Sequence, residues 1–312
     1  MTALKERFLF ACAPDSWGVL DYPGPSWNQS YEKMLDEMVE AGYTGTELGP
    51  YGFFPTDPAA LQSQLEKRNL KLLGSFVPVK MTDPAAGKAC IERIRKVGHL
   101  LATLKAPFLV MADDQSPERN AYSGRVYDKG CPALTAEQWK HVGQIVADAE
   151  KVAQEFGLDL VFHPHVATYV ETPEDCERFY EACSHTRIGL CLDTGHCVYG
   201  HGDSVKEAEK YKDKLRLVHI KDCNNAVLAE ARKNHWTFEE AIEQKVFTVI
   251  GRGGVDFPAF FRTLVKNGYS GWSVIEQDVK FGHTEIPPKD SVAASLRYLE
   301  GVVNNLSAAA KA

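Results

Sequence analysis

The chain has 312 residues, of which 44% are hydrophobic, so it is long enough to bury a large core. Its 35 lysine and arginine residues are outnumbered by 42 aspartate and glutamate residues, and the formal net charge of -7 weighs against a nucleic-acid partner, which needs a basic surface. No run approaches the ~18 consecutive apolar residues of a membrane-spanning helix, so we expect a soluble protein without a membrane partner.

Short apolar runs typical of strands alternate with longer helical patterns along the whole chain. The eight expected strands are Phe8–Ala13, Gly45–Gly49, Lys71–Val77, Pro107–Met111, Asp159–His163, Ile188–Asp193, Arg216–Ile220 and Trp272–Glu276. The expected helices are Tyr31–Ala41, Pro58–Arg68, Ala86–Leu104, Ala136–Phe156, Pro173–Cys183, Ser204–Lys212, Phe257–Asn267 and Ser291–Val303. Eight strand–helix units in 312 residues predict a single α/β domain, a (β/α)8 TIM barrel, over residues 1–312. A doubly wound open sheet is the alternative, but no Gly-x-Gly-x-x-Gly turn follows the first strand.

Two connections are longer than ordinary barrel loops. They span residues 112–135 after the fourth expected strand and 224–254 after the seventh, and the second contains a helical piece at 226–243. Because both follow the carboxyl ends of strands, we expect them to overhang the active face as walls or a lid. The alternative is that they are arms for dimerisation.

The cysteines and the first residues of the chain indicate in which cellular compartment the protein is expected. Eight cysteines are scattered without a Cys-x-x-Cys pair, and Cys12 and Cys191 fall in apolar runs where they would act as small hydrophobic side chains. Reduced thiols and a cytoplasmic location are therefore expected. The first residues lack the apolar core of a signal peptide, and the alanine-rich segment 307–312 is expected to be a disordered tail.

The last four expected strands all end in side chains that can bind a metal, namely His163, Asp193, His219 and Glu276. Each has a structural explanation when taken alone: a buried histidine that donates to a carbonyl, an aspartate that caps the next helix, or a glutamate that pairs with Arg252. Four in succession at one rim of a barrel instead predict a metal site. Nitrogen and oxygen ligands without thiolate suit Mn²⁺, Co²⁺, Fe²⁺ or Zn²⁺. The open positions of such a site favour a small polyoxygenated substrate.

Other polar residues lie close to the strand ends. Glu47, His165, His196 and Lys221 are candidates for proton transfer or substrate binding, and Glu276 could act as both ligand and base. An ion pair with Asp222 would fix Lys221. Near the first strand, Asp15 could bind hydroxyl groups and Trp17 could form an apolar wall, although Trp17 could equally belong to the core. Arg252, in a glycine-rich turn that is not a P-loop, is a candidate for binding substrate oxygens.

The motifs at these positions resemble those of the xylose-isomerase-type TIM-barrel superfamily, and within it the inosose (2-keto-myo-inositol) dehydratase-like branch. The resemblance is carried by residues 11–19, 42–52, 163–165, 192–196, 219–222 and 253–257, and so extends from the first strand to the last. It implies that His163, Asp193, His219 and Glu276 are the metal ligands, with Mn²⁺ the first choice and Co²⁺, Fe²⁺ or Zn²⁺ as alternatives. Whether His163 or His165 is the ligand from the fifth strand stays open.

The resemblance implies a metal-dependent dehydratase that acts on a keto-cyclitol through an enediolate. The residues implied in catalysis are Glu276, Lys221, Glu47 and His196. The residues implied in substrate binding are Asp15, Trp17, His165 and Arg252. The epimerases of the superfamily use two opposed glutamates, and one of these is His163 here, which favours elimination. The alternatives are a ketose isomerase or epimerase, or a β-eliminase of a 3-keto-glycoside. A non-catalytic metal-binding subunit and a phosphodiesterase of abasic DNA are further alternatives, and the acidic balance argues against the second. We expect a homo-oligomer, a dimer or a tetramer.

Overall fold

The computed structural model describes residues 4–21 and 27–309. Its strands are β1 Phe8–Cys12, β2 Gly45–Thr46, β3 Lys71–Leu72, β4 Gly74–Val79, β5 Phe108–Asp113, β6 Asp159–Phe162, β7 Gly189–Asp193, β8 Leu215–Ile220, β9 Asp222–Cys223, β10 Phe247–Thr248 and β11 Gly271–Ile275. Its helices are α1 Leu4–Arg7, α2 Tyr31–Ala41, α3 Pro58–Glu66, α4 Gly87–Thr103, α5 Pro117–Asn120, α6 Ala136–Phe156, α7 Pro173–Ala182, α8 Thr194–Tyr199, α9 Ser204–Lys210, α10 Asn225–Asn234, α11 Phe238–Glu243, α12 Phe257–Lys266 and α13 Pro288–Ala309, with the 3-10 helices η1 Pro14–Trp17 and η2 Pro84–Ala86.

The parallel strands form a nearly closed barrel in the order β3-β2-β1-β11-β8-β7-β6-β5-β4. The two ends of this order, β3 and β4, come from one run of chain that bends at Leu73. The Leu73 amide donates to the Thr46 carbonyl (3.0 Å), and the Leu73 carbonyl accepts from the Phe108 amide (2.9 Å), so hydrogen bonds continue through the bend and join the two ends. All eight expected strands and the expected TIM barrel are confirmed, with the third strand divided into β3 and β4.

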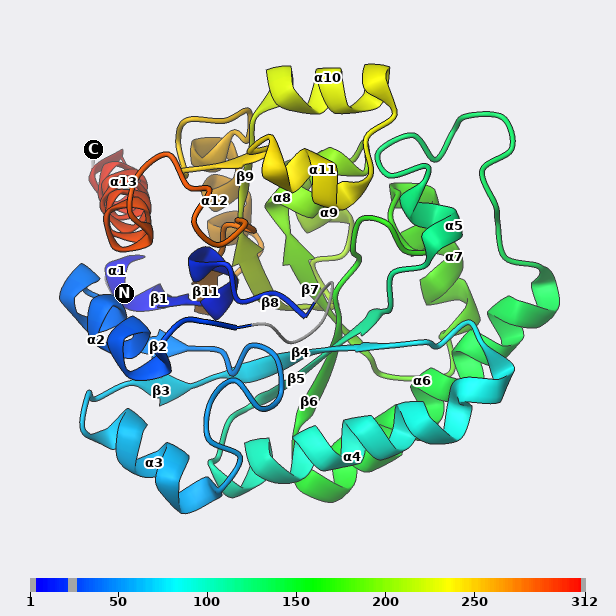
Figure 1. Cartoon of the computed structure of the whole chain (residues 1–312), viewed down its shortest axis with the longest axis horizontal. Helices are drawn as coiled ribbons and strands as arrows, with labels where there is room; N and C mark the ends of the chain where they lie inside the picture. Colours follow the sequence, from blue (N-terminus) through cyan, green and yellow to red (C-terminus); the bar gives the residue numbers. More distant parts are fainter. Residues whose placement is uncertain (1–3, 22–26, 310–312) are drawn as a thin grey trace.

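Two layers of apolar side chains hold the barrel together. The main core lies between the strands and the surrounding helices, which Figure 1 shows around the central strands. A smaller cluster fills the interior of the barrel and is lined by Ala11, Ala13, Leu73, Val110, Val161, Cys191, Leu217 and Val274. This interior is a packed core and not a pore, so ligands have access only to the ends of the strands.

Local sequence signals fix the helix ends. For example, α6 begins at a capping box formed by Thr135 and Gln138 and ends at Gly157, whose φ of 68° suits glycine. At the other end of the chain, α13 continues through Ala309, so residues 307–309 are helical and do not form the expected disordered tail; alanine is the residue that best favours a helix. The rest of that tail, 310–312, lies outside the described residues. No helix within residues 4–21 and 27–309 offers an apolar stretch that would cross a bilayer.

Helix α6 packs closely against α7 at Gly143. A Cβ atom at this position would lie 2.4 Å from the Ala182 carbonyl oxygen, a backbone atom that cannot move aside cheaply. We therefore expect Gly143→Ala to lower the free energy of unfolding, measured in urea, by about 1–3 kcal/mol. Gly301→Ala is the control, because a Cβ at Gly301 in α13 meets no described atom within 4 Å. That variant should gain about 0.5 kcal/mol through helix propensity. Equal effects at the two positions would contradict the packing argument.

Candidate metal centre and active site

The four expected ligands converge at one rim of the barrel. His163 follows β6, Asp193 ends β7, His219 lies in β8 and Glu276 follows β11. The strand register places Asp193 beside His219, and His219 beside Val274, two residues before Glu276. All four side chains are buried, and one ligand atom from each lies within 4.8 Å of the others. The four residues predicted as metal ligands are therefore brought together.

The polar atoms of this cluster are poorly satisfied by protein hydrogen bonds. His219 Nδ1 lies 3.0 Å from Glu276 Oε1, and Asp193 Oδ2 lies 3.6 Å from His163 Nε2. Among the described residues, however, none gives His219 Nδ1 or Asp193 Oδ2 a hydrogen bond of good geometry. Buried polar atoms without partners are costly, and a divalent ion bound between them would remove that cost. The donor set therefore fits a divalent metal.

Three of the four ligands have protonation states that suit a metal. Burial lowers the pKa of His163 to about 4, which keeps the imidazole neutral. For Asp193, burial raises the pKa, but Lys221 and His196 outweigh it, so the pKa lies well below its ordinary value. Glu276 likewise has a lowered pKa: burial opposes ionisation, and His219 and Lys221 favour it more strongly. Metal ions bind neutral imidazoles and ionised carboxylates, so His163 and the two carboxylates are already in the binding form. For His219, burial lowers the pKa, but Cys191, Glu276 and Glu47 outweigh it and hold the pKa well above its ordinary value, so metal binding would release a proton from this ring.

Lys221 lies at the centre of a second set of contacts. Its Nζ is 3.2 Å from Asp193 Oδ2, 3.1 Å from Glu276 Oε2, 3.1 Å from Asp278 Oδ2 and 3.0 Å from His196 Nε2. Burial lowers the pKa of Lys221, but these carboxylates raise it well above the usual value, so the side chain is an ammonium group. Nζ forms hydrogen bonds with His196 and Asp278, while the carboxylates of Asp193 and Glu276 lie at ion-pair distance.

The expected ion pair between Lys221 and Asp222 is wrong. Successive residues of a strand point to opposite faces, so Lys221 faces the metal ligands while Asp222 points away from them. The Asp222 carboxylate accepts hydrogen bonds from the amides of Gly251 (2.9 Å), Gly253 (2.8 Å) and Val255 (3.1 Å). The amides of this glycine-rich turn therefore already donate hydrogen bonds to a carboxylate of the protein.

Arg252 is in the same turn and is exposed, outside the residues that line the cavity described below. The turn wraps around Asp222, and this directs the Arg252 side chain to solvent. The structure therefore does not bring Arg252 to the site, and it also shows no pairing of Arg252 with Glu276 among the described contacts.

Two predicted residues flank the ligands closely. Glu47 follows β2 and is buried, with Oε1 at 3.2 Å from His219 Nε2. His196 lies in α8, and its amide donates to Asp193 Oδ1 (2.7 Å), so Asp193 caps α8 with one oxygen and leaves the other for the metal ligands. The capping and metal-binding interpretations of Asp193 are thus compatible.

His165, Asp15 and Trp17 differ in where they point. His165 holds Nδ1 at 2.7 Å from the Val166 carbonyl and lines the cavity, where its ring lies 3.9 Å from that of His196. Asp15 also lines the cavity, and its Oδ2 is buried with no partner among the described residues. Trp17 instead packs in the main core and donates Nε1 to Glu37 Oε2 (2.7 Å). Of the two interpretations of Trp17, the structure therefore supports the core position and not the apolar wall, because η1 turns Asp15 inward and Trp17 toward α2.

A cavity of about 760 Å³ opens above the ligands. Both long connections line it, the first with Asp113, Asp114 and Gln115 and the second with Phe238 and Glu239, so the expectation that they form walls of the active face is confirmed. Three carboxylate or amide oxygens from these segments, Asp113 Oδ1, Gln115 Oε1 and Glu239 Oε1, are buried without a described partner. The cavity thus presents acceptors that a hydroxyl-rich molecule could satisfy.

The sequence reasoning assigned no role to three residues of the site: Asp278, Glu239 and Cys191. Asp278 accepts a hydrogen bond from Lys221. Burial raises the pKa of the Asp278 carboxyl, but the charge of Lys221 outweighs this effect, so the pKa is lower than usual. It lies two residues after Glu276, on the same side of an extended chain, and this spacing was the available signal. Cys191 lies two residues before Asp193 in β7, so its side chain is on the same side of the strand as that of Asp193. Glu239 had no signal, since its place depends on the path of the long connection.

Asp113 predicts a specific pH dependence. Burial raises the pKa of Asp113 to about 7, and a hydrogen bond from the Tyr169 amide only partly opposes this. Between pH ~4 and ~7 the unfolded carboxyl is ionised while the folded one keeps its proton, so the folded state loses stability as the pH rises. Relative to Asp113→Asn, the wild-type free energy of unfolding should therefore fall by roughly 4 kcal/mol across this window. Urea unfolding at several pH values checks this, and a difference that does not change with pH would contradict it.

Comparisons with known proteins agree with this geometry. Residues 35–302 match the model of the xylose isomerase-like TIM barrel family. The chain is 34% identical to the rhizopine catabolism protein MocC of Rhizobium meliloti over 268 residues, 86% of this chain and 81% of that protein. It is 32% identical to the inosose dehydratase of Bacillus licheniformis over 278 residues, 88% and 89% of the two chains.

Solved structures give the same fold at lower identity. The crystal structure of IolI protein with a bound zinc atom superposes with a TM-score of 0.70 at 14% identity, over 95% of this chain and 98% of that one. The barrel, the rim that carries the four ligands and the match over residues 35–302 lead to one conclusion. This chain belongs to the xylose isomerase-like TIM barrel family.

Proposed function

We propose that this protein is a metal-dependent dehydratase that removes water from a keto-cyclitol such as 2-keto-myo-inositol. The observation that carries this proposal is the convergence of two imidazoles and two carboxylates on one point beside a cavity, which His163 and Glu276 line. The similarity to inosose dehydratases at 27–32% identity over most of the chain supports the substrate class. His163, at the position where epimerases have a glutamate, supports elimination over two-base epimerisation.

The metal would be held by His163, Asp193, His219 and Glu276, with Mn²⁺ as the expected ion. When bound, it would supply Lewis acidity to the ketone oxygen and so acidify the neighbouring C–H bond. Glu47 would orient His219 through the contact between its Oε1 and Nε2, as carboxylates commonly do for histidine ligands. Lys221, an ammonium group whose pKa the three surrounding carboxylates raise well above its ordinary value, would hold these carboxylates in place and would not transfer a proton, which revises its expected catalytic role.

His165 is best placed to accept the proton from carbon. The ligand side chains and Asp278 are occupied by one another or by Lys221. In contrast, His165 donates Nδ1–H to the Val166 carbonyl, which leaves Nε2 as a free acceptor in a side chain that lines the cavity. Of the two roles expected for His165, proton transfer and substrate binding, we therefore propose the first.

Asp15 is best placed to assist the departing hydroxyl. Burial and the neighbouring Glu276 and Asp278 raise the pKa of Asp15 well above its ordinary value, so the carboxyl carries a proton. The proton would pass to the leaving hydroxyl group as the C–O bond breaks, and water would leave. The unpartnered acceptors of Asp113, Gln115 and Glu239 would bind the remaining hydroxyl groups of the substrate.

Proton NMR in D₂O tests the proposal. The purified protein is analysed for metal and then incubated with 2-keto-myo-inositol. We expect the ring signals of the substrate to be replaced by those of a dehydrated product. Deuterium exchange next to the ketone without loss of water would overturn the dehydratase and favour an epimerase. If the protein loaded with Mn²⁺ does not react with 2-keto-myo-inositol, this compound is not the substrate.

His165→Gln tests the assignment of the base. Glutamine keeps much of the size and hydrogen-bonding capacity but cannot accept a proton at this site, so kcat should fall about 100-fold while KM changes little. His141→Gln is a control, because His141 lies on α6 among the helices outside the barrel. A His165→Gln protein with normal kcat and a raised KM would instead limit His165 to substrate binding.

We also propose a single domain that forms a dimer or tetramer and acts in the cytoplasm without nucleic acid. Eight free thiols support a reducing compartment, and the net charge of -7 is unfavourable for binding a phosphate backbone. Light scattering coupled to size-exclusion chromatography measures the oligomeric state.

A further inference from the structure

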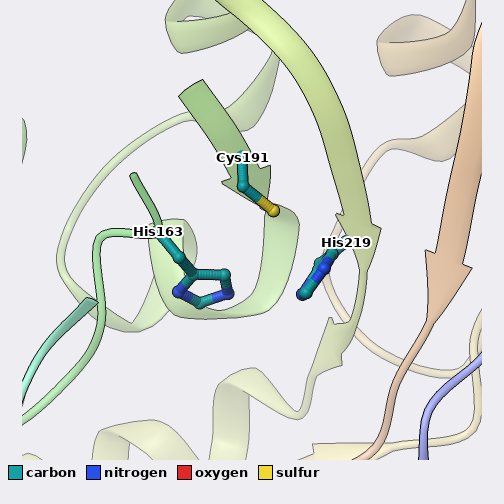
Figure 2. A group of neighbouring side chains, drawn as sticks. All are labelled: His163, Cys191 and His219. Carbon is teal, nitrogen blue, oxygen red and sulfur yellow. The ribbon is translucent and has the colours of Figure 1, made fainter. Parts of the chain in front are cut away.

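A thiol lies directly beneath the metal ligands. Cys191 precedes Asp193 by two residues in β7, so both side chains point to the same side of the strand, Cys191 one layer deeper in the barrel. The side chain is fully buried and belongs to the cluster that fills the barrel interior. Figure 2 shows its sulfur directed toward the gap between the imidazole rings of His163 and His219.

Cys191, His163 and His219 form a second group of potential metal ligands. One donor atom from each lies within 4.8 Å of the others, and all three residues are buried. Among the described residues, none donates to or accepts from Nδ1 of either histidine. His219 Nδ1 also lies 3.0 Å from Glu276 Oε1, so this ring is within reach of a ligand of the upper group as well as of the thiol.

We propose that His163, Cys191 and His219 form a second, deeper metal position that binds thiophilic divalent ions such as Zn²⁺ or Cd²⁺. The deeper position shares both histidines with the upper one, where Asp193 and Glu276 complete the ligand set, so only one of the two can be filled at a time. On binding, a metal–sulfur bond forms and the thiol proton leaves to solvent.

The two positions differ in the chemistry that they select. The upper one adds two carboxylates to the histidines, and oxygen ligands suit Mn²⁺. The deeper one adds a sulfur, which suits softer ions and completes a three-ligand set with room for a fourth in a tetrahedron. Tetrahedral sites with bonds of about 2.0–2.3 Å need donor atoms roughly 3.5 Å apart, so side-chain shifts of no more than about 1 Å close the group around an ion. The upper position would therefore prefer Mn²⁺, and the deeper position would prefer Zn²⁺ or Cd²⁺.

Cys12 provides the contrast within the same barrel. It is also a fully buried strand cysteine, but its sulfur lies 3.8 Å from Ser16 Oγ and 3.9 Å from the Ala13 carbonyl and has no imidazole beside it in the described contacts. Cys12→Ala removes the same atoms from a buried strand without touching the histidine pair, and so serves as the matched control for Cys191→Ala.

Cobalt spectroscopy tests the proposal without relying on activity. The full-length protein is freed of metal with a chelator and titrated with Co²⁺. We expect wild type and Cys12→Ala to develop a near-ultraviolet sulfur-to-cobalt charge-transfer band, and Cys191→Ala and Cys191→Ser to lack it. Two substitutions are used because serine keeps nearly the size of cysteine if alanine disturbs packing. Absence of the band in wild type, or its persistence in both Cys191 variants, would overturn the proposal.

Competition binding adds a second measurement. Loss of the thiol should weaken Cd²⁺ and Zn²⁺ binding at least 10-fold but change Mn²⁺ binding less than about 3-fold. Equal losses for all three ions would mean that Cys191 acts only through packing, and would also overturn the proposal. The NMR assay of the proposed dehydratase is independent of both readouts.

Discussion

An Asp193→Asn protein is expected to fold as wild type does, to lose its metal and to show a kcat/KM about 1,000-fold lower. The amide oxygen of asparagine can still accept from the His196 amide and cap α8, as Asp193 Oδ1 does at 2.7 Å. The negative charge that would bind the metal, opposite Lys221 and His163, is removed. Losing several kcal/mol of transition-state stabilisation corresponds to about three factors of ten in rate.

Asp203→Asn is the matched control for this substitution. Asp203 also caps a short helix, with Oδ1 accepting from the amides of Val205 and Lys206, but it lies at the start of α9 on the surface. Its metal content and kcat/KM should equal those of wild type. Metal analysis, circular dichroism and steady-state kinetics together make the comparison. An Asp193→Asn protein that retains both its metal and its activity would refute the metal centre.

Replacing Lys221 by methionine should cause the largest loss of stability. The ammonium group neutralises Asp193, Glu276 and Asp278 in a buried environment, and without it these carboxylates repel one another with only the neighbouring histidines to offset their charge. In a protein freed of metal we expect the free energy of unfolding in urea to fall by about 3–5 kcal/mol. Adding a divalent metal should restore part of the loss, because the ion supplies positive charge to the same carboxylates.

Two further variants make the Lys221 prediction specific. Lys221→Met/Asp278→Asn should be more stable than Lys221→Met, because one of the uncompensated charges is gone. Lys266→Met removes a lysine whose side chain is 72% exposed and whose ion pair with Glu209 is on the surface, so it should cost less than about 0.5 kcal/mol. If Lys221→Met were no more harmful than Lys266→Met, the ammonium group would not be what holds these carboxylates together.

The sequence predicted the barrel well because its strands are near-continuous apolar runs, buried on both faces. β7 and β8 differ from their expected ranges by only one residue at one end. The expected strand Lys71–Val77 was less accurate, since it divides at Leu73 into β3 and β4. That division depends on where the barrel closes, which is a property of the whole sheet and not of the local sequence.

The ligands could be predicted because each directly follows, ends or lies within a strand, and parallel strands place such residues on one rim. The partners of those ligands could not be predicted in this way. Glu47 meets His219 across 172 positions of sequence, and Lys221 meets Asp278 across 57. The direction of a side chain in a loop was also beyond reach, as the exposed position of Arg252 illustrates.

The carboxylate of Asp222 ties the turn at residues 251–255 to the end of β8. It is fully buried and receives three amide hydrogen bonds from the turn that ends the second long connection. If the turn lifted away alone, this carboxylate would keep only the hydrogen bond from the Cys223 amide (3.0 Å) and lose its other three donors, at a cost of several kcal/mol. The turn and the end of β8 therefore belong to one cooperative unit and unfold together. The end of the second long connection, which does not line the cavity, is therefore fixed to the barrel.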